Sequence, residues 1–245
     1  MPWPRGGRRL RKTAAMSTTL QSSSAAELVR APLLVDVVSD VVCPWCYIGK
    51  RKLETALSRL RADEPGLAPT VRWHPFELNP DLPVEGMPRA AYLENKFGGK
   101  ARAAEIYARV RAVGEEVGIA FAFDRIARQP NTRDAHRLLA WAQQRGDAGA
   151  LVERLFRAYF IEGVWIGERN LLAALAADCG LPREEAQAAL ASDACRAEVE
   201  AEYREAQEAG ITGVPFFIFN GCTAVSGAHD PDALLEAIAA ARANA

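Results

Sequence analysis

The 245-residue sequence lacks several features that mark particular classes of protein. Its apolar runs fall far short of the ~20 residues that a membrane-spanning helix needs, which argues against an integral membrane protein. Neither sign of charge is in excess, because 30 basic residues face 31 acidic ones, and this balance disfavours a nucleic-acid-binding protein. Five cysteines are too few, and odd in number, for a disulfide-framed fold. The remaining composition, 49% hydrophobic and 25% charged, is that of a globular protein.

The first 31 residues differ from the rest of the chain. Residues 1–30 carry six basic side chains and one acidic side chain, and they lack the apolar run of a secretory signal. An organelle transit peptide is one interpretation. We favour a disordered tail, or an upstream start with Met16 as the true first residue, and therefore exclude residues 1–31 from the fold.

The next segment has the pattern of a strand, a helix and a second strand. A short apolar run rich in β-branched residues at 33–38 predicts the first strand. A helix is expected to begin near Pro44, since proline is tolerated in a first turn, and to end before Pro65-Gly66. Residues 69–78 predict the second strand. This order favours a βαβ unit with a parallel pair of strands.

The C-terminal segment has the pattern of a helix, a hairpin and a last helix. A helix is expected at 193–209, and a compact apolar run predicts a strand at 216–219. The Asn-Gly pair at 220–221 is a strong hairpin signal, so residues 222–225 should form the return strand. An Asp-Pro pair at 230–231 opens the last helix.

The middle of the chain is almost entirely helical in pattern, with helix starts expected at Asn131 and Asn170. This block is too long for a connection between two strands. We therefore predict an α/β domain made of residues 32–80 and 191–245, interrupted by an α-helical insertion at 81–190.

The motif Cys43-Pro44-Trp45-Cys46 falls where the first strand turns into the first helix. A thiolate is favoured there, because backbone N–H groups and the helix dipole stabilise an anion at a helix N-terminus. Cys43 should face solvent as the nucleophile, and Cys46, one turn inside, should be the more buried resolving thiol. A zinc site would require a second ligand pair, and the other three cysteines form none, so no metal is expected.

Val214-Pro215 precedes the strand predicted at 216–219. Proline is expected there either as an ordinary trans residue at the start of a strand or as a cis peptide in a tight turn. A cis proline opposite Cys43 would leave the backbone of Val214 free to pair with an extended substrate.

Taken together, these motifs resemble the thioredoxin-fold DsbA-like family, and specifically its FrnE-type branch. The resemblance spans residues 33–243 and implies a thioredoxin-like domain with a helical insertion, a Cys43/Cys46 redox centre and a cis-Pro215 loop. The stretches that carry it are Ser39–Gly49, Pro75–Pro80, Asn131–Arg137, Gly213–Phe217 and Val225–Ala228.

The same superfamily includes 2-hydroxychromene-2-carboxylate isomerases and kappa-class glutathione transferases. Those relatives generally carry serine where Cys43 stands, and they use glutathione. Because both cysteines are retained here, the resemblance favours disulfide exchange. A glutathione-dependent isomerase or transferase is the alternative, and a non-catalytic redox sensor or chaperone-like module is the third possibility.

Several other residues are candidates for secondary roles. Asp36 and Asp40 are possible proton shuttles for the resolving thiol, although a structural role in a strand or turn is the simpler interpretation of each. His74 and His136 are expected to be structural, and Trp45 to shape the substrate face. The remaining cysteines are expected to be small apolar residues, with a disulfide between the first two left open: Cys179, Cys195 and Cys222.

We therefore expect a cytoplasmic thiol–disulfide oxidoreductase without a bound cofactor. Its substrates would be thiols or disulfides of client proteins or small molecules, with glutathione as a possible redox partner. Neither nucleic acid nor membrane is an expected partner, and the protein should be a monomer or a homodimer. Trp45, Val214 and Pro215 are the expected substrate-binding residues.

Overall fold

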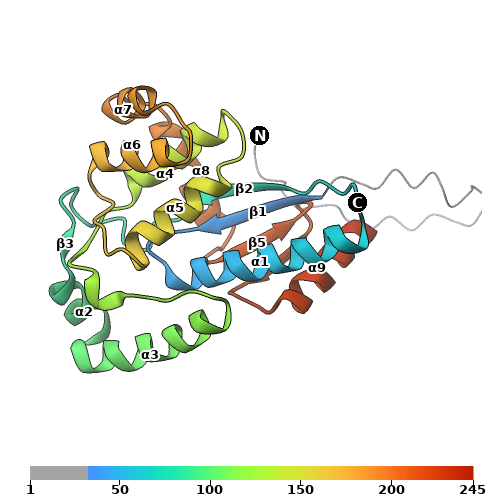
Figure 1. Cartoon of the computed structure of the whole chain (residues 1–245), viewed down its shortest axis with the longest axis horizontal. Helices are drawn as coiled ribbons and strands as arrows, with labels where there is room; N and C mark the ends of the chain where they lie inside the picture. The colour runs from blue at the N-terminus through green and yellow to red at the C-terminus, as the bar shows by residue number, and fades with distance from the viewer. Residues whose placement is uncertain (1–32, 245) are drawn as a thin grey trace, which may run out of the picture.

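The centre of the fold is a four-stranded mixed sheet (Figure 1). The computed structural model describes residues 33–244. Strands β1 (Leu34–Ser39) and β2 (Thr70–Pro75) run parallel, as the βαβ pattern predicts. Strand β5 (Phe216–Phe219) pairs antiparallel with β1, and β6 (Thr223–Ser226) pairs antiparallel with β5. The resulting order is β2-β1-β5-β6, and the predicted C-terminal hairpin is confirmed.

The two faces of this sheet bury different sets of side chains, because successive residues of a strand point in opposite directions. Val37 points into the main core, which also holds apolar residues of α1 (Pro44–Asp63) and α9 (Pro231–Ala243). These two helices lie side by side on one face (Figure 1). Val38 points the other way, into a smaller core that includes a residue of α8 (Arg196–Glu208).

The segment between β2 and β5 is helical, as predicted, apart from one short pair of strands. β3 (Met87–Pro88) pairs antiparallel with β4 (Arg128–Gln129), and strands of two residues are too short to leave a periodic pattern in the sequence. The division at residues 81 and 190 stays a proposal. Besides α8, the helical elements of this segment are α2 (Arg89–Phe97), α3 (Lys100–Glu116), the 3-10 turn η1 (Phe123–Arg125), α4 (Arg133–Gln143), α5 (Gly149–Phe160), α6 (Arg169–Asp178) and α7 (Arg183–Ala191).

Helix α4 covers the outer edge of the sheet at β2. An edge strand exposes unpaired N–H and C=O groups. The Gln143 side chain satisfies both groups of Trp73: its Oε1 accepts from the Trp73 N–H at 2.6 Å, and its Nε2 donates to the Trp73 carbonyl at 2.9 Å. This contact holds the helical segment against the sheet close to the end of β1.

Three details of the sequence prediction are corrected or lie outside the structure. β2 ends at Pro75, so the predicted continuation to 78 is wrong, because Phe76 leaves the strand to fill the smaller core. Asn170 is not the cap of α6. Glu168 is the N-cap residue of α6, because its carboxylate accepts hydrogen bonds from two N–H groups of the first turn. The tail expected at 1–31 lies outside the described residues.

His74 links the sheet to α8. Its ring nitrogens lie 2.9 Å from Asp36 Oδ1 on β1 and 3.0 Å from Glu202 Oε2 on α8. Burial by itself lowers the pKa of His74, but the hydrogen bonds to these two carboxylates outweigh burial and raise the pKa to about 9. The imidazolium form of His74 therefore joins two structural elements at neutral pH.

This ion-paired histidine should make stability depend on pH. A pKa of about 9 in the folded state against 6.5 unfolded means that the stabilisation is complete below pH 6.5 and is lost as the pH rises through 9. We expect the stability advantage over His74→Gln to shrink by up to about 3 kcal/mol across that range. Urea unfolding at several pH values measures it. His229→Gln, at an exposed histidine, is the control and should follow the wild type, whereas parallel curves for wild type and His74→Gln would contradict the prediction.

Candidate redox site

Cys43 lies at the junction between the first strand and the first helix, as predicted. Its N–H donates to the Asp40 carbonyl at 3.0 Å, closing a turn after β1, and Cys43 is the N-cap residue of α1. Pro44 occupies the first helical turn, where its missing N–H costs nothing. The Cys46 N–H donates to the Cys43 carbonyl at 3.0 Å, so the two cysteines are separated by one turn of backbone.

Both thiols are buried, and Cys43 is more enclosed than its position in the motif suggests. Cys46 is 1% exposed, as expected for the inner cysteine, but Cys43 is only 5% exposed. The expectation that Cys43 faces solvent is therefore wrong. The cause is the loop before β5, since the Cys43 thiol donates to the Val214 carbonyl at 3.6 Å. Both cysteines are free thiols, so the structure describes the dithiol form.

Burial also sets the protonation of the inner cysteine. Burial raises the pKa of Cys46 above that of an ordinary thiol, and the adjacent Cys43 is the second largest cause of this rise. Contacts with the Ser39 hydroxyl and the Asp40 backbone act in the opposite direction. Cys46 is therefore a protonated thiol at neutral pH, and it must lose its proton before it can attack a disulfide.

The loop that covers Cys43 contains a cis peptide bond between Val214 and Pro215. The implication of the resemblance is confirmed on this point. Val214 is partly buried against the main core, and so is Trp45 of the motif. The fold thus brings together four of the predicted site residues, although Val214 and Pro215 are some 170 positions from the cysteines in the chain: Cys43, Cys46, Val214 and Pro215.

Close packing holds this loop against α1. A Cβ added at Gly49 would lie 2.9 Å from Pro215 Cγ and 3.1 Å from the Phe217 ring. Only a residue without a side chain therefore fits where α1 passes beneath the loop. This is a role of Gly49 that the motif alone does not reveal.

Substitution of Gly49 by alanine should displace the loop. We expect Gly49→Ala to lower the free energy of unfolding by about 1–3 kcal/mol, because the new methyl group must push Pro215 and Phe217 outwards. Thermal unfolding with calorimetry measures the change. Gly213→Ala is the matched control, since a Cβ there meets no atom within 4 Å. Equal melting temperatures for Gly49→Ala and the wild type would contradict this account of the packing.

The two candidate proton shuttles lie in different environments. Asp40 is fully buried in the turn before Cys43, and its Oδ2 accepts from the Leu78 N–H at 2.8 Å. Asp36 pairs with His74 and with Arg72, at 2.9 and 2.7 Å. Burial raises the pKa of Asp36, but the bonds to His74 and Arg72 outweigh it and lower the pKa overall. Both acids have structural partners, and a shuttle role for either stays a prediction.

Two groups near the cysteines were not predicted as site residues. Tyr107 on α3 accepts a hydrogen bond from the buried Arg89. Burial raises the pKa of Tyr107 to about 12. His136 on α4 is buried with its Nε2 3.4 Å from Asp40 Oδ1. No local motif marks Tyr107. His136 lies within the family stretch Asn131–Arg137, and the sequence predicts a structural role for it.

The other cysteines lie apart from this centre. All three are free thiols, so the disulfide left open between Cys179 and Cys195 is not present. Burial raises the pKa of both of these thiols, and Cys222 is exposed. Within residues 33–244, no three His, Cys, Asp or Glu side chains are arranged to hold a metal ion, and no helix is long and apolar enough to cross a bilayer.

Comparison with known proteins places this geometry in a family. The model of the DsbA-like thioredoxin domain matches residues 34–239. A probable DsbA oxidoreductase from Streptomyces coelicolor is 32% identical, with a TM-score of 0.76 over 87% of this chain and 91% of that one. The uncharacterized protein YwbO of Bacillus subtilis is 29% identical over 83% of this chain and 94% of its own length.

A more distant likeness is to the cytosolic disulfide reductase DsbM of Pseudomonas aeruginosa, which has also been solved with GSH. It is 21% identical with a TM-score of 0.55, over 86% of this chain and 96% of that one, and it shows a common fold. The family match covers most of the chain and includes both cysteines and the cis-proline loop. The chain belongs to the family of DsbA-like thioredoxin domains.

Proposed function

We propose that this protein is a thiol–disulfide oxidoreductase in which Cys43 is the nucleophile and Cys46 the resolving thiol. The observation that carries the proposal is the position of Cys43, at the N-cap of α1 and 3.6 Å from the Val214 carbonyl. Backbone N–H groups at that helix end stabilise a thiolate, and the deeper Cys46 thiol is protected from outside reagents. The similarity to a probable DsbA oxidoreductase supports the same reaction class.

The reaction proceeds by two exchanges. The Cys43 thiolate attacks one sulfur of a client disulfide, forming a mixed disulfide and releasing the other client sulfur as a thiolate that takes up a proton. Cys46 then loses its proton and attacks Cys43 Sγ, which releases the second client thiol and forms the Cys43–Cys46 disulfide. The dithiol loses two electrons and the client disulfide gains them. The reverse sequence oxidises a client, and the reduction potential decides the direction.

Val214, Pro215 and Trp45 form the proposed substrate contact around Cys43. An extended client backbone would pair with Val214, while Trp45 would shape the opposite side. Glutathione is the proposed small-molecule redox partner, and the GSH complex of DsbM, a protein of the same fold, supports testing it first. We further propose a cytoplasmic location and membership of the FrnE-type branch.

The test is to equilibrate the protein over a series of reduced-to-oxidised glutathione ratios, trap thiols by alkylation, and map each cysteine by mass spectrometry. We expect Cys43 and Cys46 to convert together to an internal disulfide, with a midpoint that gives the reduction potential. Catalysed reduction or oxidation of a model client then separates an enzyme from a redox sensor that forms the disulfide without turnover.

The alternative function makes a different prediction in the same experiment. A glutathione-dependent isomerase or transferase would leave Cys46 free while Cys43 stays reduced or stops as a stable glutathione adduct. That outcome would overturn the dithiol mechanism.

A further inference from the structure

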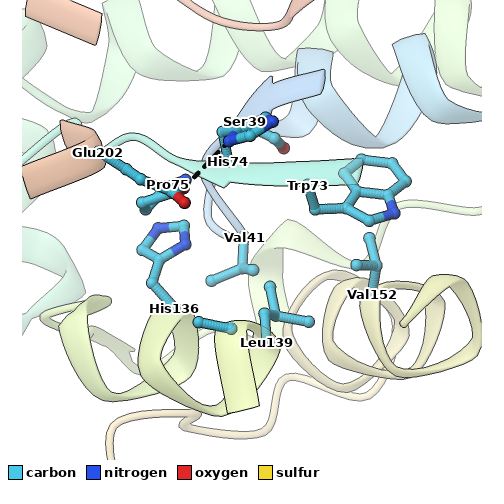
Figure 2. Close-up of a pocket in the computed structure, with 10 residues that line it drawn as sticks. Ser39, Val41, Trp73, His74, Pro75, His136, Leu139, Val152 and Glu202 are labelled. Carbon is cyan, nitrogen blue, oxygen red and sulfur yellow. Dashed lines mark hydrogen bonds and ion pairs between the residues drawn. The ribbon is translucent and has the colours of Figure 1, made fainter. Parts of the chain in front are cut away.

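A small cavity of about 10 Å³ lies between the end of β1, strand β2 and helix α4 (Figure 2). Ser39 and His136 line it from opposite sides, and both residues are more than nine-tenths buried. Ser39 Oγ and His136 Nε2 have no hydrogen-bond partner among the residues that the structure describes. His136 Nε2 lies 3.4 Å from Asp40 Oδ1, but out of hydrogen-bonding geometry.

Two such atoms beside one cavity require an explanation. A buried polar atom without a partner costs about 1–3 kcal/mol, so buried hydroxyls and imidazoles are nearly always hydrogen-bonded to protein or to ordered water. The cavity volume matches the space that one water molecule needs. One water between the Ser39 hydroxyl and the His136 ring would satisfy both atoms. Trp73 Nε1, a third unpartnered donor, lies toward Val152 at the other end (Figure 2).

The same cavity is connected to the redox centre through Ser39. The Ser39 hydroxyl lies near enough to the Cys46 thiol to lower its pKa, as does the Asp40 backbone in the turn before Cys43, although the hydroxyl is not aligned for a hydrogen bond to the thiol in this structure. Cys46 is almost fully enclosed, so its proton cannot pass directly to bulk solvent. Ser39 therefore lies between the thiol that must ionise and the cavity that His136 faces.

We propose that one water molecule binds in this cavity between Ser39 Oγ and His136 Nε2, and that this chain carries the proton of Cys46 during resolution of the mixed disulfide. The inference rests on the proposed function. Because it acts through Ser39 and the water, His136 is a positioning residue for Cys46.

The proposed resolution step conserves both protons and electrons. The Cys46 thiol gives its proton to Ser39 Oγ, the Ser39 proton moves to the water, and a water proton moves to His136 Nε2. The Cys46 thiolate attacks Cys43 Sγ, the bond from Cys43 to the client sulfur breaks, and the client leaves as a thiolate that is protonated by solvent. The imidazolium formed on His136 lies beside Asp40. The other titratable groups that line the cavity are His74 and Glu202, which pair with each other at 3.0 Å.

The test follows both exchanges in one single-turnover reaction of the reduced protein with Ellman's reagent. Attack by Cys43 releases one thionitrobenzoate, and resolution by Cys46 releases the second. The reaction is run in a chain whose other thiols are replaced by serine: Cys179, Cys195 and Cys222. We expect His136→Gln and Ser39→Ala to slow the second release about 10-fold or more and to change its pH profile, with the first release unchanged. His229→Gln, at an exposed histidine, is the control.

The outcomes separate the two proposals. Absence of a second release in the parent chain would overturn the proposed function itself. A second release in His136→Gln within about twofold of the parent, or an equal slowing of both releases, would overturn the relay and leave the proposed function standing. Should the variants not fold, magnetisation transfer from a long-lived water to the His136 ring is measured in the reduced parent protein by NMR. Its absence would also overturn the proposal.

Discussion

Replacement of Cys43 by serine is expected to abolish disulfide exchange, with the rate falling by about a thousandfold or more. A serine hydroxyl is not ionised at neutral pH and forms no stable bond to a client sulfur, so no mixed disulfide can form. Stability should change little, because the two side chains have nearly the same volume and the Val214 carbonyl remains available as an acceptor. Reduction of a disulfide-linked model peptide, followed by chromatography, measures the rate.

Cys222→Ser is the matched control for this experiment. It makes the same chemical change at an exposed cysteine outside the proposed redox centre, and we expect the rate of disulfide exchange to stay unchanged. Exchange by Cys43→Ser at more than about a tenth of the wild-type rate would mean that another thiol is the nucleophile, and the proposed assignment would fail.

Replacement of Cys46 is expected to have the second largest effect, and a different one. Cys46→Ala should still attack a client disulfide through Cys43, but the mixed disulfide should then accumulate instead of being resolved. Turnover should fall by about a hundredfold or more, since release then depends on an outside thiol. Alanine is preferred to serine here, because a hydroxyl at this 1% exposed position would require a partner of its own.

Intact-mass analysis of the reaction mixture detects the trapped species directly. The expected product is one client peptide per chain, released by a small-molecule reductant and attached through Cys43. Full activity of Cys46→Ala together with tight glutathione binding would favour the glutathione-dependent isomerase or transferase. The Cys43→Ser variant, which should form no adduct at all, completes the comparison.

The geometry explains why these two cysteines should behave so differently. Cys43 ends the turn after β1, and its thiol lies against the loop before β5, 3.6 Å from the Val214 carbonyl. Cys46 lies one turn deeper, where burial raises its pKa above that of an ordinary thiol. The same burial that protects Cys46 creates the need for a proton path.

The Cys43–Cys46 motif and much of the sheet could be predicted from local sequence. Cys43 and Cys46 follow a β-branched run and open a helix, and the Asn220-Gly221 turn falls between two strand-forming runs. Each of these signals acts within a few residues of the chain, where backbone preferences dominate. The cis form of Pro215 was left open by its neighbours alone and followed only from the family resemblance.

By itself, then, the sequence determined where the thiols lie along the chain and which elements carry them. Only the tertiary structure decided how enclosed they are: Val214 covers Cys43, and Gln143 attaches the helical segment to the open edge of β2. It also decided that His136 lies against Asp40, nearly a hundred positions away. The physical reason is that such contacts follow from the packing of whole helices and strands against one another. This packing depends on complementary surfaces that are distant in the chain, so it leaves no periodic pattern or motif spacing in the sequence.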